Sequence, residues 1–168
     1  KYQEALKCYN KIIEINPNNE VAYFNKAITY ECINNFEKAI QNYDKAIAIN
    51  SDFIEAYFNK ALILRKMGKN KDAIENNNIV LKLNPNLKET LFNNGRAYGE
   101  MRDFDKAIEY YDMAISKDPS YIHPLVNKAS LLALKGNVRK AIRCYEKVLK
   151  INSEIPEILF HLSVLCYE

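Results

Sequence analysis

Asparagine recurs at a fixed spacing in this sequence of 168 residues. The members of this Asn row, each 34 residues from the next, are Asn25, Asn59, Asn93 and Asn127. His161 holds the next place in the series. A carboxamide both donates and accepts hydrogen bonds, so one Asn can pair with an N–H and a C=O of an extended backbone at once. The row is suited to binding the main chain of an extended peptide, provided that the fold brings the amides to one surface.

Large apolar residues form a second row, one position before each Asn. The members of this Phe row are Phe24, Phe58, Phe92, Val126 and Phe160. Together with Ile28 and Leu62, the Phe side chains would form an apolar floor that suits hydrophobic side chains or an amphipathic helix of a ligand. Arg65, Lys66 and Arg96 would favour an acidic ligand.

Each of these patterns also has a purely structural interpretation, which stays open from sequence alone. The Asn side chains would then bond only a neighbouring helix or water, and the Phe side chains would be wedged between helices as core. The basic side chains would simply be solvated.

Catalytic chemistry finds no support. His123 and His161 lie about one repeat apart, and no nucleophile or set of metal ligands surrounds either of them in the sequence. No glycine-rich phosphate loop is present. Cys8, Cys32, Cys144 and Cys166 are widely separated, without a C-x-x-C pair. We expect no enzyme activity, no metal and no cofactor.

Composition narrows the class further. A hydrophobic share of 48% is enough to build a core, and a net charge of +3 is too small to indicate nucleic-acid binding. The basic residues of 139–150 are expected to form a solvated face. No apolar run is long enough to cross a membrane. We expect reduced, mostly buried thiols and a cytoplasmic location.

The spacing of 34 residues appears in three further sets of residues. The first set is Ala5, Ala39, Ala73, Ala107 and Ala141; the second is Pro17, Ser51, Pro85, Pro119 and Ser153; the third is Ala27, Ala61, Gly95 and Ala129. Three sets in one register indicate an internal repeat.

Two amphipathic helices are predicted in each repeat. Tyr23, Ala27 and Tyr30 give the first helix an apolar stripe, and residues 36–47 do the same for the second. The turn between them falls at 34–35, with Gly68 and Gly136 at the equivalent place in other repeats. Small residues are expected where paired helices cross, because a larger side chain would push their axes apart.

This pattern resembles the tetratricopeptide repeat family, whose hallmark is a 34-residue helix–turn–helix with small residues at the crossings. Residues 57–64 followed by 69–74 are similar to the family's core pattern, although Tyr or Leu stands where Trp is frequent. The resemblance covers the whole chain and implies an all-α fold, a right-handed superhelical solenoid. It also implies that first helices line a concave groove, into which the Asn and Phe rows would face, as in relatives that hold extended peptides.

The repeat boundaries follow from the same register. A lone second helix is expected in 1–19, complete repeats in 20–53, 54–87, 88–121 and 122–155, and a lone first helix in 156–168. The resemblance implies a protein or peptide partner, without nucleic acid or membrane insertion. Self-association through the terminal helices, or service as the targeting arm of a larger enzyme, remain alternatives. A chaperone-tail clamp is not expected, because its basic residues have no counterpart here.

One second helix differs from the others. Large apolar residues occupy two matched places in most second helices, for example Phe36 with Tyr43. The third repeat has Asn70 and Asn77 there. Seven residues is close to two helical turns, so both amides should face one interface. We expect residues 69–84 to be the least stable internal helix, and a possible hinge.

Overall fold

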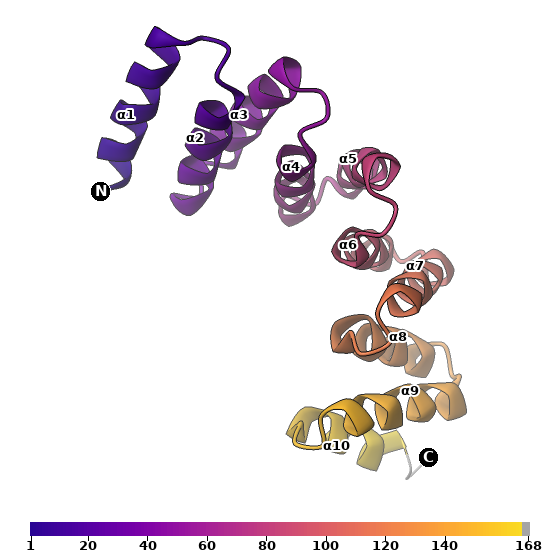
Figure 1. The fold of residues 1–168 in the computed structure, drawn as a ribbon. Helices are drawn as coiled ribbons and strands as arrows, with labels where there is room; N and C mark the ends of the chain where they lie inside the picture. Colours follow the sequence, from indigo (N-terminus) through magenta and orange to yellow (C-terminus); the bar gives the residue numbers. More distant parts are fainter. Residues whose placement is uncertain (166–168) are drawn as a thin grey trace. The chain divides into compact units, whose positions relative to one another are not determined.

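The computed structural model describes residues 1–165, and every regular element among them is an α-helix (Figure 1). The chain divides into two compact units, and each is described by itself. Unit 1, Lys1–Pro85, contains α1(Tyr2–Ile15), α2(Glu20–Cys32), α3(Phe36–Ile49), α4(Ile54–Lys66) and α5(Asn70–Leu83). Unit 2, from Asn86 onward, contains α6(Lys88–Glu100), α7(Phe104–Lys117), α8(Ile122–Leu134), α9(Val138–Ile151) and α10(Pro156–Leu165). The predicted all-α fold of helical repeats is confirmed.

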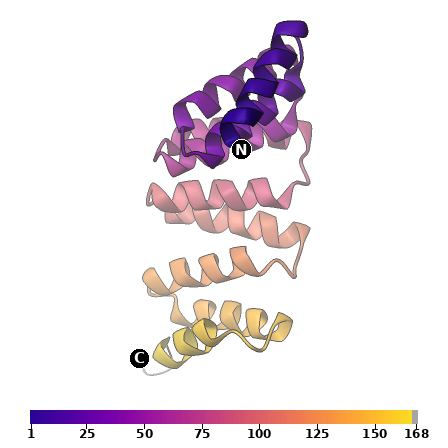
Figure 2. The ribbon, with the colours of Figure 1, turned by 90° about the vertical axis from the view of Figure 1, so that its left-hand side faces the viewer.

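Each unit is built from helix pairs that pack side by side (Figure 2). Within each pair the turn contains one residue with positive φ: Asn34 at 56°, Gly68 at 75°, Arg102 at 63° and Gly136 at 74°. Glycine and asparagine tolerate this left-handed conformation, as the sequence predicted for three of the four turns. In the first turn, Asn35 N–H donates across it to the carbonyl of Tyr30 at 2.9 Å, which satisfies a carbonyl at the end of α2.

A polar residue ends each second helix and starts the connection to the next first helix. The residues at this place are Asn16, Asn50, Asn84, Asp118 and Asn152, all with extended backbone. The Asn50 side chain accepts a hydrogen bond from the N–H of Asp52 at 3.1 Å, and Asp118 accepts one from Ser120 at 2.9 Å. Such a side chain reproduces a backbone turn, so the chain reverses direction without a long loop.

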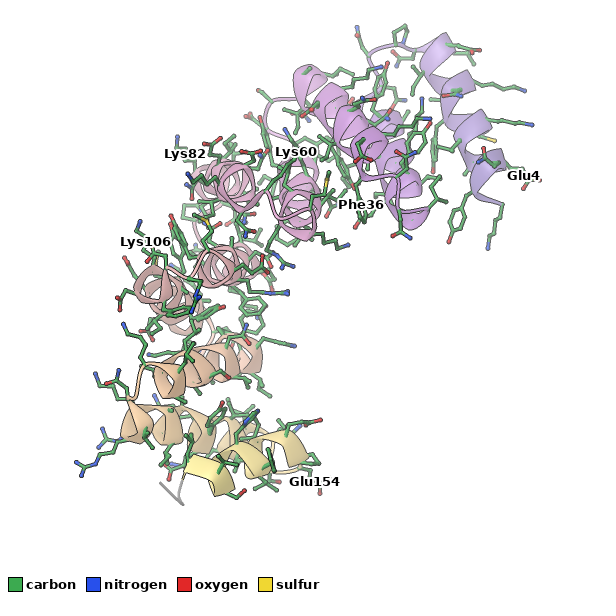
Figure 3. All side chains as sticks on the ribbon, turned by 180° about the vertical axis from the view of Figure 1, so that it is seen from behind. Glu4, Phe36, Lys60, Lys82, Lys106 and Glu154 are labelled. Atoms are coloured by element: carbon green, nitrogen blue, oxygen red, sulfur yellow. The ribbon has the colours of Figure 1, made fainter. Side chains whose placement is uncertain are left out.

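Small residues lie where paired helices cross, as predicted. Ala27, Ala61 and Ala129 are almost fully buried, and Gly95 is buried at the same place in unit 2. In the pairs of Ala27, Gly95 and Ala129 a tyrosine ring of the second helix is buried at this interface, since Tyr43, Tyr111 and Tyr145 are at most 3% exposed. In the pair of Ala61 the second helix has Asn77 at the same place. Figure 3 shows the side chains that extend from the helices of each unit.

Two expectations are wrong at the side-chain level. Cys8 and Cys32 are exposed, so only Cys144 among the described cysteines is buried. The two thiols lie on outward faces of α1 and α2, where helical spacing alone did not distinguish them from core positions. Tyr2, which holds the place of Phe36 in the lone second helix and was expected to pack against a neighbouring helix, is 51% exposed. Cys166 lies outside the described residues.

Candidate functional site: tyrosine–asparagine junctions and an open hollow

In unit 1 the Asn row is half-buried and lies beside tyrosines of the preceding second helices. The side chains of Asn59 on α4 and Tyr43 on α3 are hydrogen-bonded. Asn25 on α2 and Tyr9 on α1 line one open hollow of about 380 Å³. The carboxamide of Asn59 therefore has a partner within the fold, as the purely structural interpretation of the Asn row requires. Such a group makes up to four hydrogen bonds, so one bond to tyrosine leaves most of its capacity.

Unit 2 repeats this arrangement. Asn127 on α8 donates a hydrogen bond from Nδ2 to the hydroxyl of Tyr111 on α7 at 3.4 Å. His161 takes the next place in the row, and its ring stacks on Tyr145 with centroids 5.5 Å apart. Asn93, on α6, is only 7% exposed, which makes it the most buried amide of the row. We call this recurring contact between a second-helix tyrosine and the Asn-row residue of the next first helix a tyrosine–asparagine junction.

Two members of the Phe row, Phe24 and Phe92, pack against tyrosines of their own repeats. Phe24 lies 5.7 Å from Tyr43 and 4.8 Å from Phe53, measured between ring centroids. Phe92 lies 5.8 Å from Tyr111 and 5.5 Å from Tyr121. These rings support the interpretation of the row as wedges between helices.

The other predicted apolar residues are also partly enclosed. Ile28 packs against the buried cluster of unit 1, and Phe58 and Leu62 are half-buried. Phe24, Phe58 and Phe92, with Ile28 and Leu62, therefore present partly exposed edges to a ligand, whereas Phe160, the last member of the row, is 67% exposed.

The two predicted arginines are half-buried. The Arg96 guanidinium carbon lies 5.8 Å from the centroid of the Phe92 ring, within the range of a cation–π interaction. The five basic residues of α9 are all exposed, as expected: Arg139, Lys140, Arg143, Lys147 and Lys150.

An open hollow of about 320 Å³ lies among α6, α7 and α8 of unit 2, and we call it the Arg96 hollow. Its lining comprises Arg96, Gly99, Glu100, Tyr111, Asn127, Ser130 and Leu131. Two predicted site residues, Arg96 and Asn127, meet here. Sequence reasoning missed Tyr111, which was assigned to the core, and Ser130. Ser130 occupies the same place in its repeat as Ile28, Leu62 and Arg96, and the change from apolar to polar residues along this series is the signal that could have found it.

Burial and neighbouring charge perturb Tyr43, which belongs to a junction, and Tyr121, which lies before α8 and packs on Phe92. Burial raises the pKa of Tyr43 far above its ordinary value, and the nearby Glu31 carboxylate raises it further. Burial also raises the pKa of Tyr121. These phenols stay protonated at neutral pH, so they serve as neutral hydrogen-bonding groups and not as bases.

Within residues 1–165, no group of three or more His, Cys, Asp or Glu residues is placed to hold a metal ion. Over the same residues, every helix is too short or too polar to cross a membrane.

Paired helices with small crossing residues and tyrosine-filled interfaces define a helical-repeat protein. Comparison with known families agrees: a profile described as "Psidin, N-terminal TPR repeats region" matches residues 26–128. Two profiles described as "Tetratricopeptide repeat" match 8–41 and 122–155. The first match covers more than half of the chain. The chain belongs to the tetratricopeptide repeat family.

Individual relatives support the same conclusion. A small glutamine-rich tetratricopeptide repeat-containing protein of Dictyostelium discoideum is 50% identical over 38 residues, which are 23% of this chain and 11% of that protein. The crystal structure of MamA is 24% identical and matches with a TM-score of 0.86 over 91% of this chain and 90% of its own. YrrB, described as a TPR protein with an unusual peptide-binding site, is 21% identical, with a TM-score of 0.81 over 95% and 82%. At these identities the two structures establish the fold alone.

Proposed function

We propose that the chain is a scaffold that binds a protein or peptide, and that the junction-bearing faces of its first helices hold an extended segment of the partner. The observation that carries the proposal is the recurrence of the tyrosine–asparagine junction beside open space. In unit 2 the Asn127 junction opens directly into the Arg96 hollow. A half-buried amide next to open space can bond main-chain N–H and C=O groups whatever the ligand's side chains are.

The described part of the chain suits this role in two further ways. YrrB, which shares the fold, is described as a protein with a peptide-binding site. Cys8, Cys32 and Cys144 are free thiols, which suits a reducing compartment, and a cytoplasmic location is part of the proposal.

The test is a selection followed by a mutational series. Random twelve-residue peptides displayed on phage are selected against the full chain, and synthetic copies of the enriched peptides are titrated by fluorescence polarisation. Asn25→Ala, Asn59→Ala, Asn93→Ala and Asn127→Ala should each weaken binding by about 1 kcal/mol if the amide is used, and separated pairs should add. Asn10→Ala, at an exposed place on α1, is the matched control.

Unfolding temperatures of the same variants separate lost binding from lost stability, because Asn59 and Asn127 also hold tyrosine hydroxyls. If no peptide is enriched, or if none of the four variants weakens binding more than the Asn10 control, the proposed function is wrong.

Self-association is a second candidate, and exposed apolar side chains favour it. Leu159, Phe160 and Val164 on α10 are 52%, 67% and 46% exposed, and Ile15 on α1 is 85% exposed. Sedimentation at rising concentration tests this candidate, and Phe160→Ser should reduce any association. A chain that stays monomeric at high concentration contradicts it.

A further inference from the structure

Three lysines hold the same place in the first helices of their repeats, and their surroundings differ in charge. They are Lys26 on α2, Lys60 on α4 and Lys128 on α8. All three are half-buried, so their access to solvent is similar. The neighbouring charges are therefore the main difference among them.

Two of these lysines form an ion pair with an aspartate of the preceding second helix. The pairs are Lys60–Asp44, with 2.6 Å between Nζ and Oδ1, and Lys128–Asp112. At the place of these aspartates Lys26 has Asn10, on α1, whose amide carries no charge. Among residues 1–165, no carboxylate forms an ion pair with Lys26.

Two lysines of α3 extend over α2 on either side of Lys26. Lys45 Nζ lies 5.4 Å from the centroid of the Tyr23 ring, and Lys38 Nζ lies 5.5 Å from that of Tyr30. Tyr23, Lys26 and Tyr30 lie on one face of α2, because residues three, four and seven apart share a helix face. Two positive charges thus lie near the Lys26 amine, where the other two lysines have a negative one.

These surroundings favour the neutral form of the Lys26 amine. Burial lowers the pKa of Lys26, and the charges of Lys45 and Lys38 lower it further. On α1, the charged residues one turn from Asn10 are both exposed and form no ion pair with Lys26: Lys7 and Glu14. The neutral amine is the nucleophilic form of lysine, and a partly desolvated lysine beside other cations is an activated nucleophile.

We propose that Lys26 is a modification site that is acylated by thioesters faster than Lys60 and Lys128 are. The Nζ atom attacks the thioester carbonyl carbon, a C–N bond forms, and the C–S bond breaks with its electron pair leaving on sulfur as a thiolate. The proton that nitrogen loses goes to solvent. The product is an uncharged amide, so acylation removes the repulsion between Lys26 and the two lysines of α3. This inference is independent of the proposed peptide binding.

Lys128 isolates the effect of the carboxylate. The second helix of its repeat also has lysines at the places of the two α3 lysines, namely Lys140 and Lys147. Lys128 therefore differs from Lys26 mainly in its aspartate partner, which favours the charged ammonium form. Lys60 has an aspartate partner and no lysine at either of those places. We expect acylation rates to fall in the order Lys26, Lys128, Lys60.

The experiment measures acylation of the full, folded chain at each lysine. The probe is S-acetyl-N-acetylcysteamine with a deuterated acetyl group, an uncharged thioester that a cationic surface does not attract. After the reaction is stopped, the chain is unfolded and the remaining lysines are acetylated with unlabelled acetic anhydride. Mass spectrometry of proteolytic fragments then gives the rate at each lysine from the isotope ratio.

A reciprocal exchange of one charge makes the test specific. Asn10→Asp gives Lys26 a carboxylate like that of Lys128 and should slow its acylation about two- to fivefold, the range for an exposed ion pair. Asp112→Asn should speed the acylation of Lys128 by a similar factor. Both changes keep the shape of the side chain, and the rate at Lys60 should not change in either variant.

Urea separates the effect of the fold from that of local sequence, since the three lysines should react at equal rates in the unfolded chain. Acylation of Lys26 no faster than that of Lys128 in the folded chain would overturn the proposal. So would rates that neither Asn10→Asp nor Asp112→Asn changes, or a preference for Lys26 that persists in urea. The two variants lie in different units, so either one tests the proposal if the other fails to fold.

Discussion

The second helices α3 and α5 of unit 1 have the same length and the same place in their repeats, yet their interfaces with the preceding helices differ in chemistry. At the place compared here, α3 has Tyr43, which is fully buried. In α5 the equivalent residue is Asn77, which is 2% exposed. The fold thus buries this position in both helices, whether it holds a large ring or a small amide.

The difference teaches that burial and stabilisation are separate properties of this repeat. A fully buried large apolar side chain contributes about 1.5–3 kcal/mol, whereas a buried amide must recover the cost of leaving water through its hydrogen bonds. In α5, Asn76 donates to the carbonyl of Asp72 at 2.8 Å. Asn70 Oδ1 is buried with no hydrogen-bond partner among the described residues. We therefore expect α5 to add less to the stability of unit 1 than α3 does.

The largest test of this comparison makes α3 like α5. Tyr43→Asn should destabilise unit 1 by about 3–5 kcal/mol, the range for deleting a buried aromatic side chain. Urea unfolding followed by circular dichroism measures the change, with Gln41→Ala on the exposed face of α3 as control. A loss below about 1 kcal/mol would mean that the ring is not what holds α3, contrary to the comparison.

A second test extends the comparison to unit 2, where Gly95 replaces the alanine found at the other crossings. A methyl group there would lie 2.5 Å from Tyr111 Cε1 and 3.2 Å from the Ala107 carbonyl oxygen. Overpacking costs about 1–3 kcal/mol, which outweighs the gain of about 1 kcal/mol in helix propensity.

Gly95→Ala should therefore lower the unfolding free energy by about 1 kcal/mol. Ala129→Gly, which loses propensity without creating a clash, is the paired variant. An increase in stability for Gly95→Ala would show that the Tyr111 ring moves aside easily.

A third test compares α3 and α5 directly in the unmodified chain. Amide hydrogen exchange should be about tenfold faster across residues 70–83 than across 36–49, which corresponds to about 1.4 kcal/mol less protection. Mass spectrometry of peptic fragments under native conditions gives both rates in one sample. Equal protection of the two segments would mean that the buried amides of α5 are fully satisfied.

The smallest effect is a pH dependence confined to unit 2. A hydrogen bond from the Lys88 ammonium, helped by Ser120, lowers the pKa of Asp118 to about 2 from its ordinary 3.8. Because the pKa of Asp118 is lower in the folded chain, its ionised carboxylate stabilises the fold at pH values above 3.8. This contribution is lost as the pH falls from 3.8 towards 2. At the place of Asp118, unit 1 has Asn16, Asn50 and Asn84, which do not titrate.

In the Asp118→Asn variant, the protection of α6 and α7 against amide hydrogen exchange should therefore depend less on pH between 5 and 3. The protection of α3 should be unchanged. Exchange rates of the two units at pH 5 and pH 3 provide the measurement. An equal acid response of both units would assign the effect to other carboxylates.

The spacing of 34 residues predicted the helices, the small crossing residues and three of the four positive-φ turns. The fourth turn was not predicted from its residue type, because an arginine side chain does not favour φ of 63°, although Arg102 holds the same place in the 34-residue register as Asn34, Gly68 and Gly136. The Asn and Phe rows were located, but the tyrosines that hold them were assigned only to the core. The Arg96 hollow was not predicted, because the 34-residue register identifies which residues share a place and not whether the space beside them stays open.

The cysteines offer a built-in chemical probe of folding. Cys8 and Cys32 are accessible to a thiol reagent in the native state, whereas Cys144 is enclosed on α9 and burial raises its pKa, so little reactive thiolate forms there. With Cys166 changed to serine, fast alkylation would report the two exposed thiols of unit 1. Slow alkylation of Cys144 would report the rate at which α9 transiently opens. One reagent would then distinguish the two units by rate, without any label being introduced.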